Sequence, residues 1–277
     1  MEFTKAHGTG NDFVLLPDPD DDLALTPALV RALCDRHHGL GADGVIRLAP
    51  AREGVAGDVF MDYRNADGSL AEMCGNGVRC VAKYVADRGH VSELVRVDTR
   101  AGVKDVEVTL WHEDGTAAEL RVDMGPPAGI GSERIELEGA GDIELTTLSM
   151  GNPHAVIVMG DPTAAPLGTW AEAINADPRF PDGVNVEAIG VPRLDRIDGR
   201  IHERGVGETL ASGSGAAAMV VAAHVRGLAT REVTVALPGG ALDIVWTDET
   251  ITVTGPAVEV AHGVLGATWL GAVEAPS

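Results

Sequence analysis

Two segments of the sequence place a small polar side chain directly before a glycine-rich run that leads into a helical pattern. Cys74 precedes Gly-Asn-Gly, and Ser212 precedes Gly-Ser-Gly. A thiol at the start of a helix meets unpaired N–H groups and the positive end of the helix dipole, which favour the thiolate. The same N–H groups can hold a carboxylate. By position alone, Cys74 is either an acid–base group beside an anion site or a small buried hydrophobe.

The two segments belong to an internal repeat. The step from Cys74 to Ser212 is 138 residues, and so is the step from Arg88 to Arg226, where Arg-Gly ends each helical run. Asn65 lies at the same offset from Glu203. The repeat predicts a duplicated α+β unit with a cleft between its two copies.

Such a cleft would suit inversion at a carbon centre. One group would remove a proton from one face of the carbon, and its counterpart would deliver a proton to the opposite face. The α-proton of an amino acid is a very weak acid, so its removal requires a dry site, a stabilised carboxylate and a base tuned to the working pH.

The elements around these segments alternate between strands and short helices. We expect strands at 3–6, 13–16, 60–64, 143–150 and 155–159, and helices at 27–34, 78–88, 171–176 and 216–225. The turn Gly-Pro-Pro at 125–127 predicts the domain boundary. The first domain would comprise residues 1–124, completed by a C-terminal strand at about 261–277, and the second would comprise 125–260.

Other motifs in the sequence give no sign of a cofactor site, a metal site or a disulfide. The run Gly-Leu-Gly-Ala-Asp-Gly at 39–44 matches G-x-G-x-x-G, but it follows a helix and precedes a strand, which is the wrong order for a dinucleotide site. The chain has three cysteines without a CxxC pair, and no HExxH, so we expect neither disulfides nor a metal site. Cys34 and Cys80 fall within helical runs and are expected to be structural.

The overall composition limits the partners. The formal net charge of −21 opposes binding to nucleic acid or to an anionic membrane, although a local Arg could still bind a small anion. No window reaches roughly 18 uninterrupted apolar residues, and the first residues lack the pattern of a signal peptide. We therefore expect a cytoplasmic protein without a membrane segment.

Six motifs, taken together and in order, resemble those of the diaminopimelate epimerase family, and they span nearly the whole chain. They are HGTGNDF at 7–13, YRNADGS at 63–69, MCGNG at 73–77, GNPH at 151–154, GVNV at 183–186 and ERGVGET at 203–209. The resemblance implies an α+β fold of two pseudo-symmetric domains, each a curved β-sheet or barrel wrapped around a central helix, with the active site in the cleft between them. It also implies a cofactor-independent isomerase of lysine and amino-acid biosynthesis that acts as a homodimer on diaminopimelate.

The resemblance assigns roles residue by residue. Cys74 matches the first catalytic thiol, and His154 and Glu208 match positions near the catalytic thiols. Glu203 and Arg204 would bind the distal amino-acid end of the substrate. Further substrate contacts would come from Asn11, Asn65, Gly75, Asn76, Asn152, Asn185, Gly213 and Ser214. The asparagines are also ordinary turn residues, and Glu208 could be an ordinary charge before a helix.

The sequence departs from the family pattern at Ser212, where the family has its second catalytic cysteine. A serine hydroxyl is a far weaker acid than a thiol, so it is a poor base without a partner. Three explanations of Ser212 are open. It is an introduced substitution, or it is the natural residue of a one-thiol relative such as a dehydratase or another isomerase, or it belongs to a binding protein without activity. We favour the first reading because every other motif is intact. We expect the chain to bind diaminopimelate and to epimerise it slowly.

Overall fold

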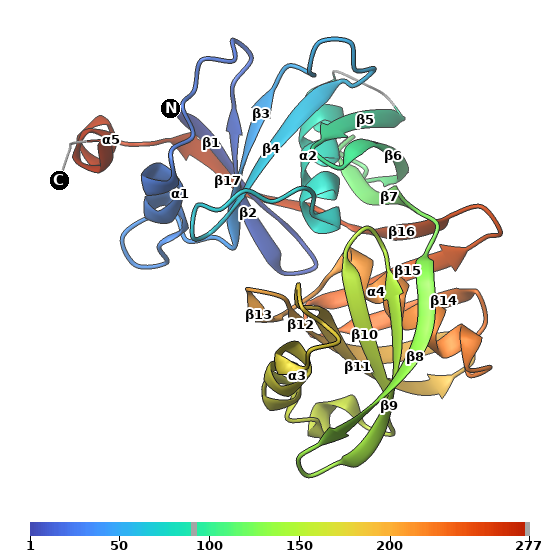
Figure 1. Ribbon diagram of the computed structural model, residues 1–277. Helices are drawn as coiled ribbons and strands as arrows, with labels where there is room; N and C mark the ends of the chain where they lie inside the picture. The colour runs from blue at the N-terminus through green and yellow to red at the C-terminus, as the bar shows by residue number, and fades with distance from the viewer. Residues whose placement is uncertain (90–92, 275–277) are drawn as a thin grey trace. The chain divides into compact units, whose positions relative to one another are not determined.

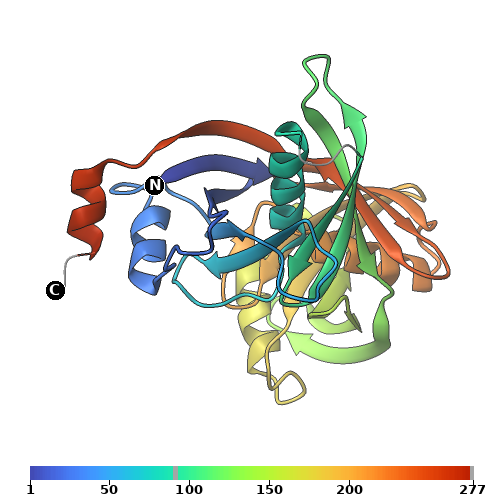
Figure 2. The ribbon, with the colours of Figure 1, turned by 90° about the horizontal axis from the view of Figure 1, so that it is seen from above.

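The computed structural model describes residues 1–89 and 93–274, and within them the chain divides into two compact units. Unit 1 comprises Met1–Val122 together with the segment that begins at Pro256, and unit 2 comprises Asp123–Gly255. Figures 1 and 2 show the two units in two views. Both contain one mixed sheet and one buried helix. Among the described residues, no helix is long and apolar enough to cross a membrane.

The sheet of unit 1 is built from eight strands. They are β1 (Glu2–Gly8), β2 (Asn11–Pro17), β3 (Gly44–Ala49), β4 (Val59–Asn65), β5 (Leu94–Thr99), β6 (Gly102–Trp111), β7 (Ala117–Gly125) and β17 (Val258–Val264). The order is β17-β1-β2-β3-β4-β5-β6-β7. The pairs β2–β3 and β4–β5 are parallel and the others are antiparallel.

Unit 2 repeats this plan. Its strands are β8 (Ala128–Leu137), β9 (Gly141–Ser149), β10 (Pro153–Val158), β11 (Asn185–Arg193), β12 (Arg196–Glu203), β14 (Glu232–Leu237), β15 (Gly240–Trp246) and β16 (Ile251–Pro256). They pair in that order, with β10–β11 and β12–β14 parallel and the rest antiparallel. A short strand, β13 (Gly207–Thr209), adds to β12.

Each sheet curves around one central helix. Helix α2 (Gly75–Asp87) contacts strands from both ends of its sheet, including β1, β2, β5, β6 and β17, and α4 (Gly213–Val225) contacts β9, β10, β11, β12, β14 and β15. Nearly every residue of both helices is buried. The run from Ala216 to Ala223 is apolar on all sides, which is typical of a helix enclosed on all faces.

The remaining helices cover the outside of each unit. Helix α1 (Pro27–Cys34) starts at Thr26, whose hydroxyl accepts from the Leu29 N–H, and it packs with α5 (Ala267–Glu274). Helix α3 (Leu167–Ala176), after the short helix η1 (Pro162–Ala164), packs against β11 and β12.

Two sequence expectations are corrected here. The strand expected at about 261–277 is β17, which ends at Val264, and Ala267–Glu274 is helical because Trp269, Leu270 and Val273 pack on the core that α1 covers. Residues 275–277 of that expectation lie outside the described residues. The two central helices each begin three residues earlier than expected, directly after Cys74 and Ser212, because the glycines there are packed tightly inside the sheets.

Candidate active site

The start of α2 brings Cys74 to the N-cap position, with an extended backbone at φ −142° and ψ 120°. The thiol makes no capping bond to the first turn of the helix. Its sulfur instead donates to Asn11 Oδ1 at 3.6 Å. Cys74 therefore sits at the start of the helix without capping it, as an acid–base group next to an anion site would.

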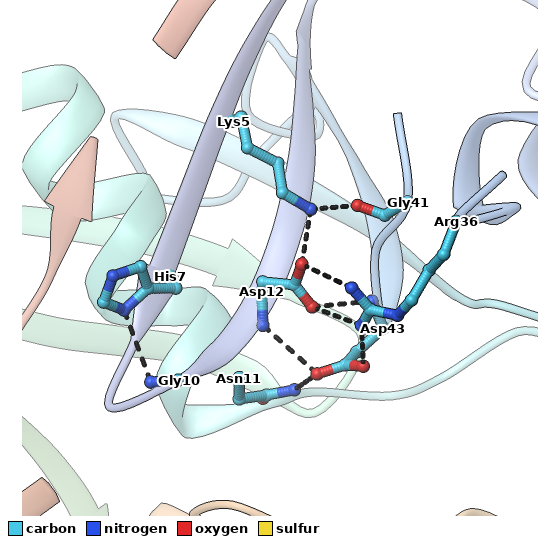
Figure 3. Close-up of polar contacts among 8 residues, drawn as sticks. All are labelled: Lys5, His7, Gly10, Asn11, Asp12, Arg36, Gly41 and Asp43. Carbon is cyan, nitrogen blue, oxygen red and sulfur yellow. Dashed lines mark hydrogen bonds and ion pairs between the residues drawn. The ribbon is translucent and has the colours of Figure 1, made fainter. Parts of the chain in front are cut away.

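The side chain of Asn11 is held in one orientation by Asp43. Asn11 Nδ2 donates to Asp43 Oδ2 at 2.8 Å (Figure 3). Because a carboxylate only accepts, this bond points Asn11 Oδ1 toward Cys74 Sγ and toward Asn76 Nδ2, which lies 3.2 Å away. Sequence reasoning missed Asp43, although it lies in the glycine-rich run at 39–44 that was singled out for another reason.

A network of charges fixes Asp43 in turn. Arg36 donates to both Asp12 and Asp43 at 2.8 Å, and Lys5 binds Asp12 at 2.5 Å (Figure 3). Burial opposes ionisation of Asp12, but the hydrogen bonds from Arg36 and Lys5 outweigh it and lower the pKa of Asp12 to about 2. The network ties the turn that carries Asn11 to the loop that carries Asp43.

Asp12→Asn is expected to reduce stability in a pH-dependent way. A carboxyl with a lowered folded pKa stabilises the fold above its unfolded pKa of about 4 and loses that contribution as the pH falls through its folded value near 2. After allowance for solvent screening, the variant should lose about 1 kcal/mol at pH near 7 and almost nothing near pH 2. Urea unfolding at both pH values checks this; an equal loss at both would contradict it.

Ser212 occupies the matching position in unit 2. It is the N-cap of α4 with φ −142° and ψ 127°, within a few degrees of Cys74. Its hydroxyl accepts from the Gly215 N–H at 3.3 Å, which is the ordinary bond of a capping serine. Ser212 and Cys74 therefore share backbone geometry and differ in what the side chain does.

A chain of hydrogen bonds leads from Ser212 to a buried pair. Ser212 Oγ lies 3.5 Å from Ser214 Oγ, which accepts from Asn152 Nδ2 at 3.3 Å. Asn152 Oδ1 lies 2.9 Å from His154 Nε2, and His154 Nδ1 lies 2.6 Å from Glu187 Oε1. The predicted residues Asn152, His154 and Ser214 thus form one connected group.

The pair of His154 and Glu187 carries no net charge. Asn152 Oδ1 accepts from His154 Nε2, so that nitrogen bears a proton, and a second proton lies between Nδ1 and the Glu187 carboxyl. Both side chains are fully buried. Burial raises the pKa of Glu187, and the neighbouring His154 opposes that rise. A neutral pair is what a dry environment permits.

The two halves differ at this pair. Residues 13 and 46 occupy in β2 and β3 the register positions that His154 and Glu187 occupy in β10 and β11. In unit 1 these residues are Phe13 and Ile46, both fully buried. Sequence reasoning missed Glu187, but an acid within the apolar strand from Asn185 to Ile189 was a signal for it.

Comparison with known proteins places the chain in a family. The model of the diaminopimelate epimerase family matches residues 3–130 and 146–260. The chain belongs to the diaminopimelate epimerase family. The diaminopimelate epimerase of Mycolicibacterium vanbaalenii is 44% identical over 98% of this chain and 99% of that protein. The diaminopimelate epimerase of Pelotomaculum thermopropionicum is 43% identical over 95% of this chain and 98% of that protein. The predicted resemblance is confirmed.

Solved structures agree on the fold. A probable proline racemase from Agrobacterium radiobacter superposes with a TM-score of 0.75 at 18% identity, covering 96% of this chain and 93% of that one. A PhzF-family phenazine biosynthesis protein from Bacillus anthracis gives a TM-score of 0.71 at 15% identity. The match covers 96% of this chain and 99% of that one. The α+β fold class predicted from the sequence is confirmed.

Other residues that the epimerase resemblance selected lie at the ends of unit 2 strands. Asn185 Nδ2 donates to the Pro153 carbonyl at 3.1 Å, and its Oδ1 accepts from the Arg204 N–H at 2.9 Å. Arg204 itself is exposed, and its guanidinium donates to the Asp182 carbonyl at 2.7 Å. Asn185 therefore anchors the backbone that presents Arg204.

Glu203 and Glu208 face different surroundings although both flank the turn at 204–206. Glu203 Oε1 accepts from Thr209 Oγ1 at 2.6 Å. Glu208 binds Arg200 through two bonds of 2.6 and 2.8 Å. Arg200 in turn donates to backbone carbonyls of the segment at 162–165. The ion pair of Glu208 thus ties β13 to η1.

Asn65 is engaged locally in unit 1. It ends β4, and its Nδ2 donates to Ser69 Oγ at 3.1 Å. The Asn65 N–H also donates to the Ser69 carbonyl. These bonds close the turn that leads from β4 toward Cys74.

The three cysteines of this epimerase-family chain differ in burial. Burial raises the pKa of Cys34 and of Cys80 to about 12 in each case, whereas Cys74 is partly exposed. We expect iodoacetamide at neutral pH to modify Cys74 alone in the folded protein and all three thiols after unfolding. Peptide mass spectrometry reads the sites, with Cys74→Ala as the control; labelling of Cys80 in the folded chain would contradict the expectation.

Proposed function

We propose that this chain acts on diaminopimelate by transferring protons at the α-carbon, without a cofactor, in the direction of L,L- to meso-diaminopimelate and back. The observation that carries the proposal is that Cys74 and Ser212 begin two equivalent helices with matching backbone angles. Membership in the diaminopimelate epimerase family and the names of its relatives support the substrate.

The proposed reaction moves one proton off the α-carbon and another onto it. In one direction, Cys74 as thiolate takes the α-proton as its C–H bond breaks, and the electron pair is left on the carbon and its carboxylate. The group at position 212 then donates a proton to the opposite face. With Ser212 that second transfer is slow, because a hydroxyl bound as a helix cap is a weak acid and a weaker base.

The proposed substrate contacts follow the polar groups around each helix start. Asn11 and Asn76 in one half, and Asn152 and Ser214 in the other, are buried or partly buried and oriented by fixed partners. Amides Gly75 and Gly213 would bind the reacting carboxylate, as helix N-termini bind anions. The remainder of the substrate is assigned to Asn65, Asn185, Glu203 and Arg204. The side chains that support the reacting groups are His154 and Glu208.

The distal contacts are proposed on chemical grounds. Diaminopimelate carries an ammonium and a carboxylate at each end. Glu203 matches the ammonium, and the exposed guanidinium of Arg204 matches the carboxylate, for which an Arg fork is suited.

The test is solvent deuterium uptake by substrate in the chain as written. Incubated in D₂O, the protein should exchange the α-proton of one epimer of diaminopimelate slowly, with little inversion, because Cys74 serves one face. Lysine, which lacks the distal carboxylate, should exchange far less. Cys74→Ala is the control and should abolish exchange. Equal exchange of lysine and diaminopimelate, or exchange that survives Cys74→Ala, would sink the proposal.

A second candidate is a one-thiol relative that protonates or eliminates at one face of another amino acid. The capping bond of Ser212 to the Gly215 N–H favours it, because the hydroxyl already has a structural task. Complete absence of exchange with every stereoisomer of diaminopimelate, combined with exchange of a hydroxylated amino acid, would select this candidate.

We also propose that the chain forms a homodimer in the cytoplasm and serves lysine biosynthesis. The dimer is supported by exposed valines along β17, a strand paired with β1: Val258, Val260 and Val264 are 41%, 59% and 70% exposed. Light scattering of the purified chain gives the oligomeric state, and a monomer at micromolar concentration would refute the dimer.

A further inference from the structure

We propose that Arg79 is a positioning residue for Cys74: its buried guanidinium supplies the positive charge that stabilises the Cys74 thiolate and sets the orientation of Asn76. This deepens the proposed function, in which Cys74 is the working acid–base group. Arg79 lies on α2, a little more than one turn after Cys74.

Arg79 is a fully buried cation without an acidic partner. Its side chain is 0% exposed, and among the ion pairs of residues 1–89 and 93–274 none includes it. Its Nη1 has no hydrogen-bond partner within that part of the chain. A guanidinium stays protonated in proteins, so this charge needs an anion nearby. Lys83, the other buried cation of the helix, has one: it pairs with Asp87 at 2.8 Å.

Hydrogen bonds connect the guanidinium to the thiol in three steps. Arg79 Nη2 donates to Asn76 Oδ1 at 2.8 Å. This bond turns Asn76 Nδ2 toward Asn11 Oδ1 at 3.2 Å, and the same Oδ1 accepts from Cys74 Sγ at 3.6 Å. Loss of Arg79 would therefore remove the bond to Asn76 Oδ1 and loosen the amide that meets Asn11 beside the sulfur.

The turn between β1 and β2 is shaped around the guanidinium. A Cβ at Gly8 would lie 3.1 Å from Arg79 Nη2, so a larger residue there would press on the guanidinium. Thr9 has a positive φ of 51°, which is strained for a β-branched residue, and its Oγ1 accepts from Arg79 Nη2 at 3.4 Å. Strain of this kind persists where the surrounding structure enforces it.

The nearby thiols leave Cys74 as the counter-ion. Burial lowers the pKa of Arg79, while negative charge on Cys80 or Cys74 would raise it. Cys80 has a pKa of about 12 and is neutral at working pH. Because the effect of two charges is mutual, the arginine favours the thiolate of Cys74 as much as that thiolate favours the arginine.

Other charged groups near α2 have partners of their own. Asp12 on β2 is bound by Lys5 of β1 and by Arg36, and His7 on β1 accepts from the Gly10 N–H. The acids of β5, β6 and β17, the other strands that contact the helix, are also paired, namely Asp98 with Arg52, Asp105 with Arg96, Glu107 with Arg121 and Glu259 with Arg88. In unit 2 the residue equivalent to Arg79 is Ala217, so the buried cation serves one half only.

The experiment measures the alkylation rate of Cys74 by iodoacetamide against pH, without substrate, in the parent, Arg79→Gln and Arg79→Lys. The midpoint of this profile reports the thiol pKa. Arg79→Gln should raise it by at least about one unit, leaving about tenfold less thiolate at neutral pH, and Arg79→Lys should stay close to the parent. Lys83→Gln, which removes a paired buried cation of the same helix, is the matched control and should not raise the midpoint.

Three results would overturn the proposal. They are an unchanged midpoint in folded Arg79→Gln, an equal rise in Arg79→Gln and Arg79→Lys, and a parent midpoint at or above about 8.5, the value of a free thiol. The third result, the midpoint of the parent, needs no variant. It therefore tests the proposal even if Arg79→Gln does not fold. A higher KM for diaminopimelate with an unchanged midpoint would assign Arg79 to the substrate carboxylate instead. Because substrate is absent from the alkylation, a wrong substrate assignment leaves this result intact.

Discussion

Ser212→Cys is expected to raise the rate of epimerisation of diaminopimelate by about 10²- to 10⁴-fold, which is the range that a well-placed acid–base group contributes. The backbone at Ser212 already matches that at Cys74, so the new thiol would start from the same position relative to its helix. It would also give up the capping bond that the Ser212 hydroxyl accepts, and Cys74 begins its own helix without such a bond. The epimer ratio over time, from L,L- and from meso-diaminopimelate separately, measures the gain.

Ser214→Cys is the matched control for this gain. Ser214 lies on the same first turn, 3.5 Å from Ser212 between the two hydroxyl oxygens, and so offers a thiol in nearly the same place but on the wrong residue. It should give no comparable increase. If Ser212→Cys and the parent epimerise at the same rate, the second acid–base group does not reside at position 212.

The two positions should also be separable by stereochemistry. The parent, with a thiol at Cys74 only, is expected to exchange the α-proton of one epimer. Adding Cys74→Ser to the Ser212→Cys variant leaves a thiol at the other position only, and it should exchange the other epimer. Identical preferences in the two proteins would contradict a reaction with one group on each face.

His154→Phe is expected to destabilise the protein by about 3–5 kcal/mol, because it leaves the fully buried carboxyl of Glu187 without its partner. Glu187 Oε2 already lacks a hydrogen-bond partner among the described residues, so nothing nearby replaces the imidazole. Glu187→Ile alone should cost less, about 1–3 kcal/mol, because a neutral imidazole is left with one unpaired nitrogen. The midpoints of urea unfolding measure both losses.

The double variant His154→Phe with Glu187→Ile should recover most of the stability of the parent. It copies the pair Phe13 and Ile46, which fill the equivalent positions of the first sheet. A buried polar pair replaced by apolar residues of similar volume is often neutral or stabilising. If the stability loss of the double variant equals the sum of the two single losses, the two side chains do not act as a pair.

The sequence by itself determined the duplicated plan. The repeated spacing between Cys74 and Arg88 and between Ser212 and Arg226 is local information, since glycines, a helical run and an Arg-Gly end recur within about fifteen residues of each other. The motifs were sufficient to identify the family, and with it the fold class.

Only the tertiary structure decided which side chains meet. Asp43 orients Asn11 from 32 residues away, and Glu187 pairs with His154 from 33 residues away. Such contacts depend on the register of parallel strands, which alternation of polar and apolar residues does not specify. The same reason applies to the pairing of Glu208 with Arg200, because the register of β12 with β13 fixes the face on which Glu208 lies.

The burial of Arg79 without an acid also belongs to the tertiary structure. An arginine in a helical run normally indicates a solvated face, and nothing within α2 marks this one as enclosed. Its environment is created by strands from both ends of the sheet that close around the helix, and by the turn at Gly8 and Thr9. The sequence placed the thiol at the helix start, and the packing of distant strands set the charge that surrounds it.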